Sequence, residues 1–69
     1  MDAHVYKHLT LTGSSDKSIE DAVETAIGRA ARTMRNLQWF QIRETRGNIV
    51  DGKVAQWQVT LDVGFTLDE

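Results

Sequence analysis

Polar and apolar residues alternate along three stretches of this chain. The clearest covers residues 53–67, where every second side chain from Trp57 onward is apolar. Because successive side chains of a strand point to opposite faces, this period of two predicts a strand with one apolar face. The same pattern predicts strands over residues 4–11 and 39–50. Asp51-Gly52 lies between the last two stretches and predicts a two-residue hairpin turn.

A different period separates the first two predicted strands. From residue 19 to residue 37, apolar side chains recur at spacings of three and four, which predicts a helix of about 19 residues. Ser18 and Asp21 form a near capping box at its start, with Asp in place of the usual Glu or Gln. Residues 12–15, Thr-Gly-Ser-Ser, supply the turn that precedes it. The apolar stripe consists of Ile19, Val23, Ala26, Ile27, Ala30, Met34 and Leu37.

These elements predict an α+β fold with the order β-α-β-β, in a single domain that spans residues 1–69. One helix covers only one face of a three-stranded sheet, so we expect the other face to meet water or a polar lumen. A two-residue turn also sets the register of the hairpin. It places four pairs opposite each other: Ile42 with Leu61, Phe40 with Val63, Thr45 with Gln58, and Trp39 with Gly64.

The size of the chain favours self-association. A domain of 69 residues buries only about 60% of the surface that its unfolded chain exposes. Small domains often compensate with disulfides or a structural metal, but this chain has no cysteine and no Cys/His cluster. Oligomerisation is the remaining route to stability, and we expect a homo-oligomer.

Charge and hydropathy argue against several classes of partner. The formal net charge is -2 and the 8 basic residues form no run, whereas a nucleic-acid-binding surface is basic and clustered. No apolar stretch reaches the ~20 residues that a membrane span needs. No signal peptide precedes the first predicted strand, which favours a cytoplasmic location.

Trp39 stands out because it shares a strand face with polar residues. Strand parity places it beside Gln41 and Arg43 rather than on the apolar face. An aromatic side chain in such a place is either an interface anchor or a stacking platform for a planar ligand. Gln58 lies on the same predicted face, and its amide is either solvated or matched to the imide edge of a heterocycle. Within one hairpin the two are about 20 Å apart at ~3.3 Å per residue, so a shared ligand requires a second subunit.

Other reactive side chains form no recognisable site. His4 and His8 lie ~13 Å apart along a strand, too far to share one metal ion. Glu20, Asp21 and Glu24 cluster where a helix dipole favours negative charge, so they indicate a helix start rather than a catalytic acid and base. No serine or threonine has a base in a recognisable arrangement beside it. The residues therefore predict neither an enzyme nor a metal site.

Several short motifs follow one another in a specific order. They are Val5-Tyr6-Lys7, Leu11-Thr12-Gly13-Ser14-Ser15, Ser18-Ile19-Glu20-Asp21-Ala22-Val23, Trp39-Phe40, Thr45-Arg46-Gly47, Trp57-Gln58-Val59 and Val63-Gly64-Phe65. In content and spacing, nearly the whole chain resembles the dodecins. The resemblance implies a flavin-binding protein that is not an enzyme. It also implies a three-stranded antiparallel sheet wrapped around one long helix, and assembly into a hollow homododecamer.

The resemblance also implies a set of flavin-binding residues. Trp39 matches the tryptophan that clamps stacked flavins against its symmetry mate, and Gln58 matches the glutamine that hydrogen-bonds the isoalloxazine ring. Arg46 matches an arginine near the flavin, and Glu44 falls where a carboxylate reaches the ribityl chain. The implied cofactor is riboflavin or FMN. The implied roles are flavin storage, sequestration and photoprotection.

Two other functions stay open. Some bacterial dodecins bind coenzyme A near the three-fold axes through basic residues. Arg29 matches one of these, whereas Thr66 stands where an arginine is expected. The other alternative is an oligomeric interaction module without a cofactor, in which Trp39 is an interface anchor.

Overall fold

The computed structural model describes residues 3–67 and contains one helix and three strands within that range. The order is β1 (Tyr6–Ser15), α1 (Ile19–Ala30), β2 (Leu37–Val50) and β3 (Lys53–Thr66). β3 is the central strand and pairs antiparallel with β1 on one side and β2 on the other. The predicted β-α-β-β order and the three-stranded antiparallel sheet are confirmed.

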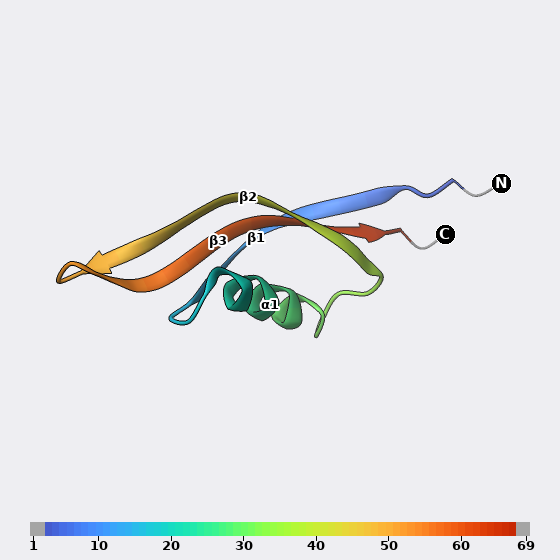
Figure 1. Ribbon diagram of the computed structural model, residues 1–69. Helices are drawn as coiled ribbons and strands as arrows, with labels where there is room; N and C mark the ends of the chain where they lie inside the picture. The colour runs from blue at the N-terminus through green and yellow to red at the C-terminus, as the bar shows by residue number, and fades with distance from the viewer. Residues whose placement is uncertain (1–2, 68–69) are drawn as a thin grey trace.

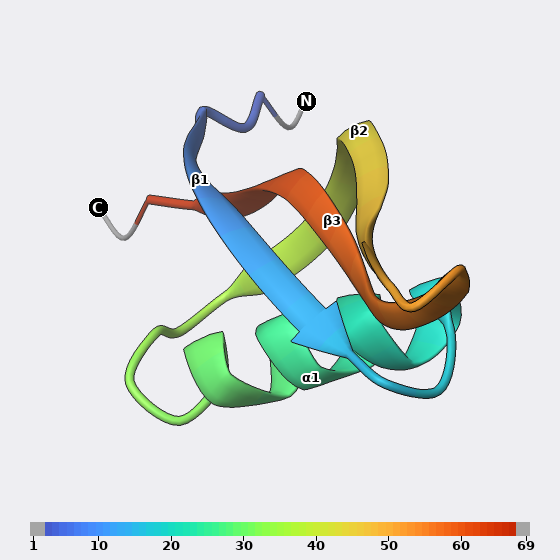
Figure 2. The same ribbon diagram turned by 90° about the vertical axis from the view of Figure 1, so that its left-hand side faces the viewer.

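The helix covers one face of the sheet, as Figure 1 shows. It packs on β1 and β3, and β1 crosses over it in the view of Figure 2. The core combines small side chains from α1 with larger ones from β3: Ala22, Val23, Ala26, Val59, Leu61 and Val63. The three β3 residues are at most 1% exposed. We call the sheet face toward α1 the inner face and the opposite one the outer face.

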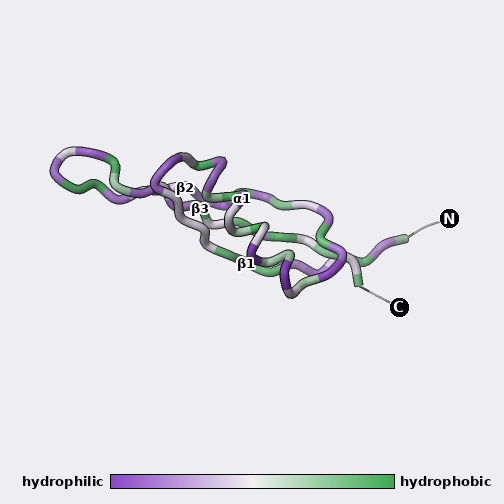
Figure 3. Tube along the Cα trace, turned by 90° about the horizontal axis from the view of Figure 1, so that it is seen from below, coloured by the Kyte–Doolittle hydropathy of each residue, from purple (hydrophilic) through white to green (hydrophobic). Residues whose placement is uncertain are grey.

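The inner face of β2 is only partly covered. Phe40 is 49% exposed and Ile42 is 41% exposed, although both pair with core residues of β3. The β2–β3 hairpin also extends beyond α1 (Figure 1), and its end carries apolar segments, green in Figure 3. The apolar residues at the hairpin end are Ile49, Val50 and Val54, each at least 54% exposed.

α1 begins where the sequence predicts. The Ser18 side chain accepts a hydrogen bond from the Asp21 N–H at 3.0 Å, which satisfies one of the free amides at the helix start. The Asp21 carboxylate accepts a hydrogen bond from the Ser15 hydroxyl at 2.6 Å. The end of β1 and the first turn of α1 are thereby linked.

α1 ends earlier than predicted. It stops at Ala30 after 12 residues, so the expected length of about 19 residues is wrong. Beyond Ala30 the hydrogen bonding changes to a three-residue spacing, since the Thr33 N–H donates to the Ala30 carbonyl at 3.2 Å. Asn36 then adopts a left-handed φ of 65°. Leu37 still packs against the core, but from the start of β2. Its apolar character therefore extended the helical pattern past the real end of the helix.

The predicted turn at residues 12–15 is also wrong, because these residues continue β1 and pair with β3. Gly13 is the informative member. A Cβ atom at this position would lie 2.4 Å from the Ala22 carbonyl oxygen and 2.9 Å from the Ala26 Cβ. Glycine therefore permits close approach of α1 to β1, and it does not mark a turn.

The Asp51-Gly52 turn forms as predicted. Both residues have positive φ angles, 53° and 75°, as a type I′ turn requires. Val50 pairs with Lys53 across the turn. The turn chemistry therefore sets the start of the hairpin register.

Farther from the turn, the predicted register is only partly correct. Three predicted pairs are confirmed: Ile42 with Leu61, Phe40 with Val63, and Trp39 with Gly64. The pairing of Thr45 with Gln58 is wrong, since Arg46 lies opposite Gln58. A register shift in β2 between Ile42 and Glu44 produces the difference.

Candidate ligand-binding site

Trp39 lies on the outer face, directly opposite Gly64 of β3. A Cβ atom built on Gly64 would be 2.1 Å from Cε2 and 2.3 Å from Cζ2 of the indole. Since carbon atoms in contact are about 3.5–4.0 Å apart, the indole occupies the space that any larger residue at position 64 would need. Trp39 is nevertheless 38% exposed. Strand pairing therefore holds a flat aromatic surface against the sheet and leaves part of it open.

Two rings of β1 flank this indole. The Tyr6 ring lies edge-on, at a centroid distance of 6.2 Å and an interplanar angle of 62°. The His8 ring is 6.0 Å away at 41°, and His8 pairs with Gly64 from the other side. Neither ring is parallel to the indole. We call Tyr6, His8, Trp39 and Gly64 the aromatic platform.

A second group of predicted site residues lies nearer the hairpin turn. The Arg46 Nε donates a hydrogen bond to the Gln58 amide oxygen, Oε1, at 3.0 Å. The Arg46 Nη1 forms an ion pair with Glu44 Oε1. The Arg46 and Glu44 side chains are 51% and 60% exposed, so both remain accessible to a ligand. We call Glu44, Arg46 and Gln58 the arginine cluster.

The aromatic platform and the arginine cluster are separate within one chain. Trp39 pairs with Gly64 and Arg46 pairs with Gln58, which is six positions away on β3. At ~3.3 Å per residue, this corresponds to about 20 Å. The structure thus brings Glu44, Arg46 and Gln58 together and leaves Trp39 apart from them. One ligand contacts both groups only if a second copy of the chain contributes one of them.

The arginine cluster lies on the outer face because of the bulge in β2. Strict alternation from Trp39 places Thr45 on the outer face and Arg46 on the inner one. In the structure, β2 has one extra residue between Ile42 and Glu44. The side chains that follow it therefore point to the opposite faces, and Arg46 lies on the same face as Trp39. Bulges redirect side chains in this way.

Asp62 lies between the two groups on the outer face and was not predicted as a site residue. It is 6% exposed, and its Oδ1 accepts a hydrogen bond from the Thr10 hydroxyl at 2.6 Å. Its Oδ2 accepts one from the Arg43 Nη1 at 2.8 Å. The Thr10 hydrogen bond first, and then the hydrogen bond and charge of Arg43, lower the pKa of Asp62 despite desolvation. A sequence signal existed, because Asp62 is the one charged residue in the stretch 54–67.

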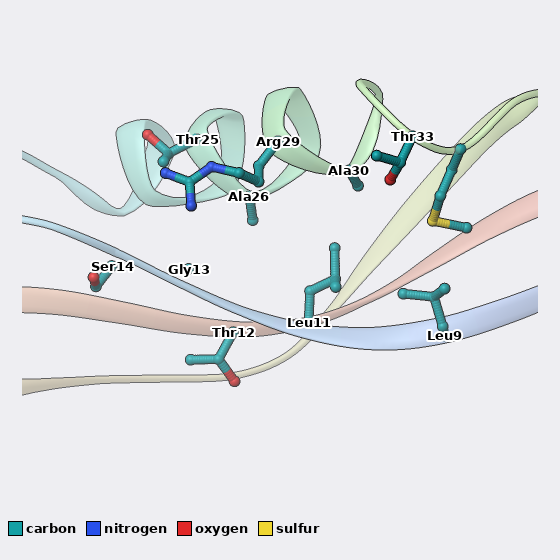
Figure 4. Close-up of a pocket in the computed structure, with 11 residues that line it drawn as sticks. Leu9, Leu11, Thr12, Gly13, Ser14, Thr25, Ala26, Arg29, Ala30 and Thr33 are labelled. Atoms are coloured by element: carbon teal, nitrogen blue, oxygen red, sulfur yellow. The ribbon is translucent and has the colours of Figure 1, made fainter.

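A cavity of about 460 Å³ lies between α1 and the edge strand β1, as Figure 4 shows. Arg29 is the charged residue in its wall, and its side chain extends along the helix toward Thr25. Thr66 lines a different hollow of about 230 Å³, which it shares with Arg35. The two positions considered for coenzyme A therefore lie in separate depressions of one chain.

Residues 3–67 contain neither a metal-binding cluster nor a membrane-spanning helix. In that range, no group of three or more His, Asp or Glu side chains is placed to hold a metal ion. No helix there is long and apolar enough to cross a membrane.

The chain matches known proteins over almost its whole length. A family model described as Dodecin matches residues 5–68. A curated dodecin from Thermus thermophilus is 45% identical over 65 residues, which is 94% of either chain. The solved structure of dodecin from Streptomyces coelicolor has a TM-score of 0.93 at 43% identity, covering 100% of this chain and 99% of that one. Dodecin from Streptomyces davaonensis has a TM-score of 0.92 at 43% identity, and the match covers 99% of this chain and 100% of that one.

Proposed function

Because this chain belongs to the dodecin family, we propose that it is a flavin-binding protein that holds riboflavin or FMN on Trp39. It acts by binding rather than by catalysis. The observation that carries the proposal is the Trp39 indole, which lies against Gly64 while Trp39 stays 38% exposed. An isoalloxazine ring is flat and polarisable, so it stacks favourably on such a surface.

Self-association completes the site. A flavin on Trp39 reaches an arginine cluster only from another copy, since about 20 Å separates the two groups in one chain. A groove of about 450 Å³ between α1 and β2, lined by Ile27, Phe40 and Ile42 among others, offers an apolar contact for that copy. Each Å² of apolar surface that such a contact removes from water stabilises the assembly by about 25 cal/mol. We propose a homododecamer, as the family resemblance implies, in which symmetry-related Trp39 side chains enclose the flavins.

The arginine cluster supplies the polar contacts. The Arg46 hydrogen bond occupies the Gln58 amide oxygen, which leaves the amide NH₂ group to donate to a carbonyl of the isoalloxazine ring. Arg46 also provides positive charge for the phosphate of FMN. Glu44 is a carboxylate acceptor for hydroxyls of the ribityl chain.

The proposed roles are flavin storage, sequestration and photoprotection. The Trp39 indole would donate an electron to a bound flavin that light has excited and would then take the electron back, so that both return to the ground state. The absorbed energy is then released as heat, and the flavin does not react further. The same stacking quenches flavin fluorescence, so binding can be followed by the loss of emission.

A riboflavin titration followed by flavin fluorescence tests this function. We expect strong quenching with the wild-type protein and loss of most affinity in Trp39→Ala. Trp57→Phe is the matched control, because Trp57 pairs with Gly47 on the inner side of the hairpin, away from the aromatic platform. It should quench like the wild type. Equal quenching by wild type and Trp39→Ala contradicts stacking, and absence of quenching by the wild type favours the cofactor-free interaction module.

Coenzyme A binding is the second candidate, favoured by the cavity beside Arg29. An arginine side chain suits the phosphates of such a ligand. Thr66, in place of a basic residue, argues against it. Denaturation of the purified protein and chromatography of the released small molecules separate the candidates. Released flavin supports the first function, and an adenine nucleotide without flavin supports the second.

A further inference from the structure

Residues 44–48 of β2 are displaced by one position relative to both ends of the hairpin. Register shifts occur at Ile42/Glu44 and again at Asn48/Ile49. Residues 49–50 and 39–42 keep the simple register that the turn sets, and a third shift follows at Leu37/Trp39. A displacement of one residue exchanges the two faces for every side chain in the segment. A hairpin that keeps the turn register throughout, without the two shifts, is an alternative pairing of the same strands. We call it the unbroken register, and it places Thr45, not Arg46, opposite Gln58.

The first shift is tied to β3 and β1 by Asp62. Arg43 is the extra residue of the bulge, and its Nη1 donates to Asp62 Oδ2 at 2.8 Å. The other carboxylate oxygen accepts from the Thr10 hydroxyl of β1 at 2.6 Å. Asp62 is 6% exposed, so one nearly buried carboxylate links all three strands at the bulge.

The charges on the outer face agree with the bulged register. Arg43 points to Asp62, and Glu44 takes the position opposite Thr60. Glu44 in turn pairs with Arg46. The unbroken register places Arg43 opposite Thr60 and moves the side chains of Glu44 and Arg46 to the inner face, where the apolar core lies. The Asp62–Arg43 pair and the Glu44–Arg46 pair thus favour the same one-residue shift.

We propose that Asp62 is a positioning residue, which holds Arg43 in the bulge and thereby keeps Glu44 and Arg46 on the ligand-binding face. This inference rests on the proposed function, since it deepens the account of how the arginine cluster is presented to a flavin. Asp62 acts through the strand register and does not touch the ligand. Thr10 supports it by fixing the second carboxylate oxygen.

Hydrogen–deuterium exchange of the ligand-free protein tests the register directly. We expect Asp62→Asn to accelerate exchange about tenfold or more in residues 43–48, and to leave residues 6–11 of β1 unchanged. Asp51→Asn is the matched control, because it removes the same charge from the turn of the same hairpin. Unchanged exchange in residues 43–48, or an increase spread evenly over all three strands, would overturn the positioning role. If Asp62→Asn does not fold, Arg43→Gln removes the same ion pair and leaves the Thr10 bond in place.

A double-mutant cycle on FMN affinity gives the second readout. Asp62→Asn should weaken FMN binding roughly twofold to tenfold in the wild-type background, the range of one or two lost hydrogen bonds. In a background that carries both Glu44→Ala and Arg46→Ala, it should have no further effect. Additive losses would overturn the inference. If the wild type binds no flavin, the proposed function fails, and the exchange experiment still decides the role of Asp62.

Discussion

Gly64→Ala tests whether the contact between the indole and the sheet sets the ligand platform. The added Cβ would lie 2.1 Å from Cε2, 2.3 Å from Cζ2 and 2.6 Å from Cδ2 of Trp39. Carbon contacts are ordinarily about 3.5–4.0 Å long, so the indole must withdraw by at least about 1.4 Å. Gly64 lies in a paired stretch of β3 between two strands, which leaves the side chain, rather than the backbone, to move.

The expected loss of flavin affinity follows from stacking. An aromatic pair contributes about 0.5–1.5 kcal/mol beyond area burial, and each flavin of a stacked pair that is clamped between two indoles contacts one of them. We therefore expect Gly64→Ala to weaken riboflavin binding roughly twofold to tenfold. The assay is the fluorescence titration, with the melting temperature measured in parallel.

Two controls separate displacement of the indole from other effects of the new methyl group. Gly28→Ala makes the same change on α1, where a Cβ meets nothing within 4 Å, and it should leave affinity unchanged. In a Trp39→Ala background, Gly64→Ala should cause no additional loss, because the displaced ring is already absent. Affinity within twofold of the wild type in the single Gly64→Ala variant refutes the reasoning.

Three further predictions concern other parts of the molecule. Gln58→Ala should weaken riboflavin binding by about 0.5–1.5 kcal/mol in the same titration, the value of one neutral hydrogen bond, and unchanged affinity removes Gln58 from the site. Gly13→Ala should destabilise the fold by about 1–3 kcal/mol in urea unfolding, because its Cβ would meet the Ala22 carbonyl oxygen at 2.4 Å; wild-type stability would show that α1 moves away freely. The pKa of Asp62 is lowered, chiefly by the Thr10 hydrogen bond, so the stability from its carboxylate is fully present above the unfolded pKa and is lost as pH falls through the folded one. The stability difference between wild type and Asp62→Asn should therefore shrink below about pH 5, and a difference that stays constant down to about pH 3 contradicts the shift.

The sequence predicted the position of Trp39 correctly because the two register shifts between the turn and Trp39 have opposite directions and cancel. Turn chemistry at Asp51-Gly52 sets the register, and Trp39 falls opposite Gly64 as expected. The same count fails for Thr45, which lies between the two register shifts. The two shifts cancel, so the prediction is right at both ends of the hairpin and wrong in the middle.

The errors at α1 have a similar origin. Leu37 fits a helical spacing and also packs on the core, but as the first residue of β2. Gly13 fits a turn composition, yet its lack of a side chain is used by the helix that packs on it. In both cases the pattern detected a real structural requirement. That requirement comes from packing against a segment distant in the sequence, and not from the local element that was predicted.

By itself, the sequence determined the order of the elements, the hairpin turn, the apolar face of each strand and the outer position of Trp39. These depend on periodicity and turn chemistry, which act between near neighbours in the chain. Only the tertiary structure decided where α1 ends, how closely it approaches β1, and that Arg46 rather than Thr45 faces Gln58. The reason is that the bulge is held by side chains far apart in sequence, since Asp62 bonds Arg43 across 19 positions and Thr10 across 52.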